Sequence, residues 1–202
     1  MKKLIIIIAD LASTSAIAQR SFWSFNYHMS FATGEQQDYI DRGSFRGISI
    51  DGRGFMTDNI SIGGSFSWEV FDEIKRNLPP QPFDLGVDNI EGVVSGTQYR
   101  YLNTLPIMVN GHFYLGSDGT VRPYFGLGLG TSYVEERTDV GLVSILGKKW
   151  GFAVQPEVGV LVPFGLTGAV ANISGRFRYT TETTDTLPIS FFTLAIGLGF
   201  VN

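Results

Sequence analysis

Large apolar side chains alternate with small or polar ones along several stretches of this chain, and this period of two constrains the fold more than any other feature. Successive side chains of a β-strand point to opposite faces, so such a stretch predicts a strand whose two faces meet different surroundings. In the clearest stretch, residues 23–32, the apolar set is Trp23, Phe25, Tyr27, Met29 and Phe31, and the residues between are Ser24, Asn26, His28, Ser30 and Ala32.

The same alternation recurs along the sequence and predicts eight strands. It is clear in residues 23–32, 60–71, 151–162 and 192–200, and weaker in residues 47–56, 104–115, 124–134 and 169–180. Pro106 and Pro156 lie inside two of these segments. Because proline cannot donate a ladder hydrogen bond, we expect a bulge or a locally open pairing at both positions.

The connections between these segments alternate between short and long. Residues 57–59, 116–119 and 163–168 are tight turns rich in Gly, Asp and Asn, whereas residues 33–44, 72–97, 135–149 and 181–187 are longer and polar. Short turns at one end and long loops at the other are typical of bacterial outer-membrane barrels. The sequence therefore predicts an all-β fold, an eight-stranded antiparallel up-and-down transmembrane β-barrel, with both termini periplasmic.

The longest connection, residues 72–97, contains Pro79, Pro80 and Pro82. A loop of this length with several prolines is expected to lack regular structure. We therefore expect it to form an irregular extracellular excursion.

Side-chain size decides which face of the barrel points inward. The interior of an eight-stranded barrel is only just wide enough for side chains to fill it. The apolar set is dominated by Phe, Trp, Tyr, Ile and Leu, whereas the other set contains many Ser, Gly and Ala. We therefore expect the bulky residues to face outward, toward lipid, and reject a soluble lipocalin-like barrel with apolar residues inside.

The N-terminal segment has the parts of a secretory signal peptide. Two lysines precede an apolar stretch that begins at Leu4, and Ala16-Ile17-Ala18 has the small-x-small form of a cleavage site, although Asp10 interrupts the apolar stretch. We predict cleavage after Ala18. The chain then divides into a signal peptide, residues 1–18, and one outer-membrane β-barrel domain, residues 19–202.

Composition excludes several classes of function. The chain has no cysteine, so disulfides and thiol chemistry are excluded. It has 15 basic and 19 acidic residues, and removal of Lys2, Lys3 and Asp10 with the signal peptide leaves 13 and 18, a formal charge of −5. An acidic chain argues against a nucleic-acid partner. No apolar run in residues 19–202 approaches the roughly 18 residues of a membrane helix, so strands must cross any membrane.

Two motifs resemble strands of a known family. Residues 122–130, Arg-Pro-Tyr-Phe-Gly-Leu-Gly-Leu-Gly, resemble the PYxGxGxG strand of the outer-membrane β-barrel protein family that includes OmpW-like and OmpX-like small eight-stranded barrels, and residues 155–160 are similar to its PExG strand. The closing segment, 191–200, resembles the aromatic-ended strand recognised during barrel assembly, although Val201 and Asn202 follow Phe200. The resemblance implies insertion by the barrel assembly machinery and no single function.

Charged residues on the inward-facing positions are few and balanced in sign. Counting residues from the short turns places Glu69 and Arg178 at similar heights, toward the extracellular side, and Glu157 and Arg176 nearer the middle. Because unpaired buried charges are costly, we expect these side chains to form ion pairs that fill the lumen and fix the strand register. A charge gate on a narrow pore is the alternative. The lumenal charge network comprises Asp51, Arg53, Glu69, Glu157, Arg176 and Arg178.

Little in the sequence indicates catalysis or a cofactor. Neither His28 nor His112 has a cysteine or carboxylate at ligand spacing, so we expect no metal and no cofactor. His28-Met29-Ser30 resembles the His-x-Ser pair of lipid A deacylase barrels, but the strand register turns both polar side chains into the lumen, away from lipid. Gly126, Gly128 and Gly130 lie in a strand with no helix after it, so we interpret them as small inward residues rather than a phosphate-binding loop. We expect that the protein is not an enzyme.

Three functions remain open for an integral protein of the cell outer membrane in contact with outer-membrane lipid. The first, which we favour, is a structural or interaction barrel whose loops bind an unidentified extracellular ligand while side chains fill the polar lumen. The second is a narrow porin-like channel for small or hydrophobic solutes, as the OmpW-like relatives imply. The third is a lipid-modifying outer-membrane enzyme.

Overall fold

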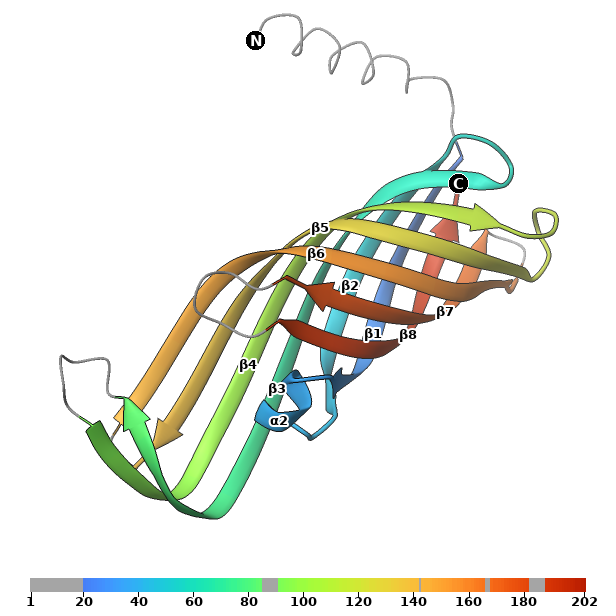
Figure 1. The fold of residues 1–202 in the computed structure, drawn as a ribbon. Coiled ribbons are helices and arrows are strands. Elements are labelled where there is room, and N and C mark those ends of the chain that lie inside the picture. The colour runs from blue at the N-terminus through green and yellow to red at the C-terminus, as the bar shows by residue number, and fades with distance from the viewer. Residues whose placement is uncertain (1–19, 85–90, 142, 166–167, 182–187) are drawn as a thin grey trace, which may run out of the picture.

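Eight antiparallel strands, each paired with its neighbours along the chain, close into a barrel (Figure 1). The computed structural model describes residues 20–84, 91–141, 143–165, 168–181 and 188–202, with the backbone alone for residues 77–84, 91–95 and 143. The predicted signal peptide lies outside the described residues. The elements are β1 (Ser21–Thr33), α2 (Gln36–Tyr39), β2 (Ser44–Phe55), β3 (Ile60–Asp84), β4 (Glu91–Tyr114), β5 (Arg122–Val140), β6 (Val143–Pro163), β7 (Ala169–Thr180) and β8 (Ile189–Val201).

Strand β1 pairs with both β2 and β8, which closes the sheet and confirms the predicted eight-stranded fold. The β2–β3, β4–β5 and β6–β7 connections lie at one end of the barrel, here called the short-turn end, and the other connections lie at the long-hairpin end (Figure 1). The backbone N–H of Ser21 donates to the carbonyl of Asn202 at 3.0 Å, so both ends of the described chain lie at the short-turn end. Among the described residues, no helix is long and apolar enough to cross a membrane.

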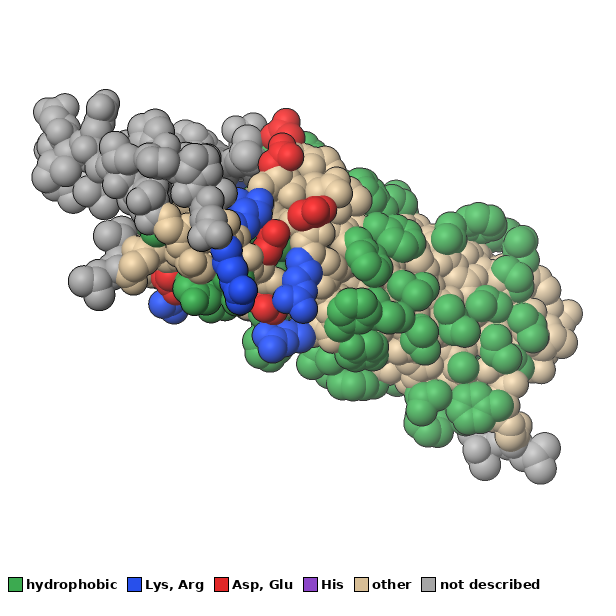
Figure 2. Space-filling view, turned by 90° about the horizontal axis from the view of Figure 1, so that it is seen from below, with side chains coloured by type: hydrophobic (Ala, Val, Ile, Leu, Met, Phe, Trp, Pro, Cys, Tyr) green, Lys and Arg blue, Asp and Glu red, His purple; other side chains and the backbone are tan. Residues whose placement is uncertain are grey.

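The alternation of side chains separates two surfaces of the barrel. On β1, Phe25 is 56% exposed while the next residue, Asn26, is 0% exposed. Figure 2 shows the consequence: apolar side chains cover the body of the barrel, and charged side chains gather toward the long-hairpin end. An apolar outer belt of this kind suits contact with lipid hydrocarbon.

The connection at residues 72–97 was wrongly predicted to be irregular. Strands β3 and β4 continue through it as a paired hairpin, with Asp84 opposite Glu91, and β5 and β6 likewise continue through most of residues 135–149. Beyond Glu69, the described backbone pairings of β3 are with β4 alone. Proline is tolerated in an edge strand because one side of that strand needs no backbone donor. The pairing register of β3 with β4 shifts twice between Lys75 and Gln81, around Pro79 and Pro80.

Pairing is locally open at both prolines that lie inside the barrel wall, as predicted. The β3–β4 ladder has no paired positions between Phe66↔Ile107 and Glu69↔Thr104, which spans Pro106. The β6–β7 ladder has none between Val154↔Tyr179 and Glu157↔Arg176, which spans Pro156. The register on either side is unchanged, so each proline opens the ladder without a bulge.

Candidate functional site

The interior of the barrel is polar at mid-height because the inward positions of the strands carry charged and hydroxyl side chains. Asp51 and Arg53 come from β2, Glu69 from β3, and Glu157 from β6, while Arg176 and Arg178 come from β7. All six members of the lumenal charge network are at most 5% exposed. Charges buried this deeply are tolerated only when they are paired and hydrogen-bonded.

Four of these residues form an alternating cluster on the side of the short-turn end. Arg176 Nη2 lies 2.5 Å from Asp51 Oδ2, and Arg176 Nε lies 3.3 Å from Glu157 Oε2. Arg53 Nη2 lies 3.5 Å from one oxygen of Asp51 and 3.5 Å from one oxygen of Glu157. Each carboxylate therefore contacts both guanidinium groups, and the cluster carries no net charge.

The remaining two residues form a second cluster closer to the long-hairpin end. Arg178 Nη1 lies 2.9 Å from Glu69 Oε2, and Arg178 Nε donates to Gln155 Oε1 at 2.9 Å. Thr104 Oγ1 donates to Glu69 Oε2 at 3.1 Å, and His28 Nδ1 lies 2.9 Å from Glu69 Oε1. Glu69 thus has partners from three other strands.

Ser49 connects the two clusters. Its Oγ lies 3.0 Å from His28 Nε2, accepts from Arg176 Nη1 at 3.3 Å, and donates to Asp51 Oδ1 at 3.2 Å. Asn26 Nδ2 also donates to Ser49 Oγ at 3.1 Å. The polar interior is therefore one continuous hydrogen-bonded network.

The sequence did not indicate several neutral partners in this network. Tyr124 Oη donates to Glu157 Oε1 at 2.6 Å, and Arg53 Nη1 donates to Tyr114 Oη at 3.0 Å. Gln155 accepts from Arg178, and His28 was considered only as a ligand or catalytic group. All four occupy inward positions of their strands, so the period of two was the signal that could have identified them.

Apolar layers lie on both sides of the polar network. At the short-turn end the buried residues are Phe22, Phe55, Tyr114, Tyr124, Leu161 and Val170. At the long-hairpin end they are Ile40, Phe71, Leu102, Val134, Ile189 and Phe191. Along the described interior, a solute on the barrel axis would therefore meet an apolar layer, the ion pairs and a second apolar layer.

The connection after β1 folds over the long-hairpin end and contributes Ile40 to the second apolar layer. Tyr39 Oη lies 2.8 Å from Thr138 Oγ1, and Arg100 Nη1 donates to the Tyr39 carbonyl at 2.9 Å. Lys75 Nζ donates to the Asp38 carbonyl at 2.8 Å. Burial raises the pKa of the Tyr39 hydroxyl, so it remains a hydrogen-bond donor well above neutral pH.

The resemblance of His28-Met29-Ser30 to a catalytic pair is not matched by the geometry. His28 is 0% exposed and forms hydrogen bonds with Glu69 and Ser49. Ser30 Oγ does not contact His28 in these bonds but lies 2.8 Å from Thr193 Oγ1. Within the described residues, no group of three His, Asp or Glu side chains is placed to hold a metal ion. His112 instead packs edge-on against Tyr124, with ring centroids 5.5 Å apart.

Comparisons with known proteins agree with this architecture. The family described as outer membrane protein beta-barrel domain matches residues 7–200. No curated protein matches the sequence. Among solved structures, Neisserial surface protein A (NspA) is 11% identical, with 89% of this chain and 96% of that chain covered and a TM-score of 0.58. The Yersinia pestis attachment invasion locus protein, Ail, is 14% identical, with 92% and 100% covered and a TM-score of 0.56. At these identities the likeness shows the fold.

Proposed function

Because the chain belongs to the family of outer membrane protein β-barrel domains, we propose that this integral outer-membrane protein is an interaction barrel rather than a channel. Its body anchors it in lipid, its lumen is filled by side chains, and the sheet raised above the long-hairpin end binds an extracellular partner. The lumenal charge network has a structural role, because its ion pairs join strands on opposite walls and fix their register.

The observation that carries this proposal is the contrast in strand length around the barrel. Strands β3 to β6 have 19 to 25 residues, whereas the other strands have 12 or 13. The surplus forms a raised sheet, which we define as residues 70–84, 91–103, 135–140 and 143–148. Strands of about 9 to 11 residues already cross a membrane, so the raised sheet is longer than membrane spanning requires.

Among the described residues, two edges of the raised sheet have no paired strand beside them. Its β3 part pairs with β4 alone, and from Val143 to Gly151 the described pairings of β6 are with β5. A free edge can pair with an extended segment of another protein, and charged side chains on it limit unspecific association. Exposed ion pairs such as Arg137–Asp139, 2.9 Å apart, stabilise little and are available to a partner.

The orientation we propose places the long-hairpin end outside the cell and both termini in the periplasm. The long polar connections at that end and the charged side chains that gather there support it. We also propose that the barrel assembly machinery recognises β8, on which Phe200 faces outward with 59% of its surface exposed. The first connection, held by β3 to β5, would then cover the outer mouth.

The test removes the raised sheet and leaves the barrel. Residues 73–100 and 136–147 are each replaced by Asn-Gly, which joins Asp72 to Tyr101 and Glu135 to Lys148, positions that already face each other. Bacteria displaying the full chain should adhere to epithelial cell layers, and bacteria displaying the shortened barrel should not. Equal adhesion by both, with heat-modifiable gel migration showing that both are folded, would contradict the proposal.

A second arm of this experiment tests the filled lumen. Liposomes containing the full chain should take up small sugars and amino acids no faster than protein-free liposomes. Uptake above that control would favour the channel function. Ail was crystallised with the heparin analogue sucrose octasulfate, so this compound is a defined soluble probe for competition with adhesion.

Passage of hydrophobic solutes is a second candidate function, favoured by the open ladder at Pro106. A groove of about 350 Å³ on the outer surface next to it is lined by residues that include Trp68, Leu105 and Tyr133. A solute could leave toward lipid there without crossing the whole lumen. Pro106→Val would restore the missing donor, and reduced uptake of an alkane by cells carrying that variant would support this function.

We propose no catalytic role for the chain. The hydrogen bonds of His28 to Glu69 and Ser49, and of Ser30 to Thr193, support this, because neither side chain is directed at lipid. An altered lipid A profile on deletion of the protein, restored by the wild-type chain and not by His28→Ala, would contradict it.

A further inference from the structure

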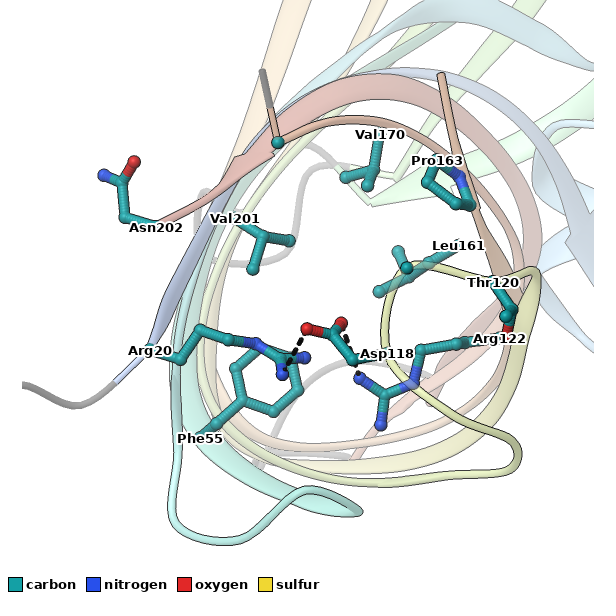
Figure 3. A pocket seen from close by; sticks show the side chains of 12 residues that line it. Arg20, Phe55, Asp118, Thr120, Arg122, Leu161, Pro163, Val170, Val201 and Asn202 are labelled. Atoms are coloured by element: carbon teal, nitrogen blue, oxygen red, sulfur yellow. Dashed lines mark ion pairs between the residues drawn. The ribbon is translucent and has the colours of Figure 1, made fainter. Parts of the chain in front are cut away.

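A pocket of about 220 Å³ opens at the short-turn end of the barrel (Figure 3). It lies outside the lumenal charge network, and the apolar layer at this end separates the two. Its wall combines charged, aromatic and aliphatic side chains, among them Arg20, Phe55, Asp118, Arg122, Leu161 and Val170.

Two arginines share one carboxylate at this pocket. Arg20 Nη1 lies 2.7 Å from Asp118 Oδ2, and Arg122 Nη1 lies 3.6 Å from Asp118 Oδ1 (Figure 3). Both guanidinium groups also lie over the Phe55 ring, 4.3 Å and 5.6 Å from its centroid. Arg122 Nη2 also donates to the backbone carbonyl of Asp58, so a second acidic residue lies beside the two arginines.

Several donors of these arginines are buried without a hydrogen-bond partner among the described atoms. They are Nε and Nη2 of Arg20 and Nε of Arg122, and Arg122 as a whole is only 3% exposed. A buried donor without a partner is costly, and a charged one more so. An anion that moves the Asp118 side chain aside would reach these guanidinium groups and supply the missing acceptor.

Asp118 is placed so that a second anion could join it or displace it. Its side chain is 55% exposed, and it lies on the β4–β5 turn between Gly116 and Gly119, whose φ angles of 85° and 74° favour glycine. A carboxylate on an exposed turn is held by little besides its two ion pairs. It therefore marks the place where a carboxylate from outside would bind.

The other side of the pocket is aliphatic. Leu161 is 2% exposed and Val170 is 6% exposed, and Val201 lies beside them (Figure 3). Val201 is only half-buried, so a ligand that contacts it gains from covering apolar surface, whereas a small inorganic anion would leave that surface uncovered. The pocket thus matches a charged group attached to a short apolar body.

We propose that this pocket binds a small aliphatic carboxylate, with its carboxylate on Arg20 and Arg122 and its hydrocarbon part against Val201, which packs on Leu161 and Val170. Such a group occurs on short-chain fatty acids and at the C-terminus of a peptide that ends in an aliphatic residue. The two sources share the chemistry recognised here, and separate probes distinguish them.

The test titrates the full chain, in lipid nanodiscs, with hexanoate and with N-acetyl-leucine while the methyl resonances of Leu161, Val170 and Val201 are followed by NMR. At least one acid should shift these resonances in a saturable way, and its uncharged counterpart, hexanamide or N-acetyl-leucinamide, should bind about tenfold more weakly or less. Whichever acid binds more tightly identifies the source. Absence of saturable shifts with both acids, or equal binding of acid and amide, would overturn the proposal.

Variants assign the binding to this pocket. Arg122→Gln and Arg20→Gln should each weaken binding about tenfold, because each removes a charge-assisted hydrogen bond. Asp118→Asn keeps both arginines and removes the competing carboxylate, so this variant should bind the acid more tightly. Weaker binding by Asp118→Asn would overturn the proposal. This outcome can be measured even if an arginine variant fails to fold. Arg46→Gln, an exposed residue of β2 outside the pocket, is the matched control and should bind as the wild type does.

Discussion

Glu69 on β3 and Arg178 on β7 meet across the interior of the barrel, with Arg178 Nη1 2.9 Å from Glu69 Oε2. The two strands are four positions apart in an eight-stranded sheet, so this ion pair joins opposite walls. Arg178→Met would leave Glu69 buried without its guanidinium partner. We expect the free energy of unfolding, measured by urea denaturation in lipid vesicles, to fall by about 3–5 kcal/mol.

The control for this prediction is the double variant Glu69→Gln with Arg178→Met. Removing both charges leaves no uncompensated ion, so the double variant should lose less stability than the two single variants together. Additive losses would show that the two residues stabilise the barrel independently of each other.

Gly126 provides a test of how tightly the interior is packed. A Cβ at this position would lie 2.7 Å from His112 Cδ2, and the His112 ring is itself packed against Tyr124. Gly126→Ala should therefore lower the free energy of unfolding by about 1–3 kcal/mol. Gly111→Ala is the matched control, because an added Cβ there meets no atom within 4 Å, and it should change stability by less than about 0.5 kcal/mol.

The period of two predicted the eight strands and the inward charges because one face of each strand meets lipid and the other meets the lumen. The same signal disappears where both faces meet water. Residues 135–139 carry Glu, Arg, Thr and Asp without an apolar face, and the continuation of β5 through them was therefore missed. The pairing of β5 with β6 in this part depends on backbone hydrogen bonds and on the short connection between the two strands. The hydrophobic pattern of the sequence contains no information about either.

The sequence was sufficient to place the six charged side chains of the lumenal charge network inside the barrel. It was less informative about the neutral residues that form hydrogen bonds with them. Counting residues from the short turns placed Glu69 level with Arg178, because strand register converts sequence distance into height. Counting residues did not predict that His28 lies between Glu69 and Ser49, or that Tyr124 donates a hydrogen bond to Glu157. Those contacts depend on the tilt and closure of the barrel, which bring strands distant in the sequence to the same point.

The first connection should open without unfolding of the barrel. Ile40 is 0% exposed in the apolar layer at the long-hairpin end, and Arg42, two residues later, is exposed. Ile40→Asp places a charge in that layer, so the connection should detach and trypsin should cleave after Arg42 about tenfold faster or more. Asp41→Asn, an exposed neighbour, is the control. Unchanged cleavage in Ile40→Asp would show that the polar contacts of Tyr39 hold the connection by themselves.

The proposed orientation can be tested with single cysteines because the natural chain has none. Ser117 lies in a turn at the short-turn end and Ser144 lies in the raised sheet, and both are exposed. A maleimide attached to a large polyethylene glycol cannot cross the outer membrane, so on intact cells it should label Ser144→Cys and not Ser117→Cys. After the outer membrane is permeabilised both variants should be labelled, which controls for reactivity. Labelling of Ser117→Cys on intact cells, with Ser144→Cys protected, would reverse the orientation and place the carboxylate pocket, rather than the raised sheet, outside the cell.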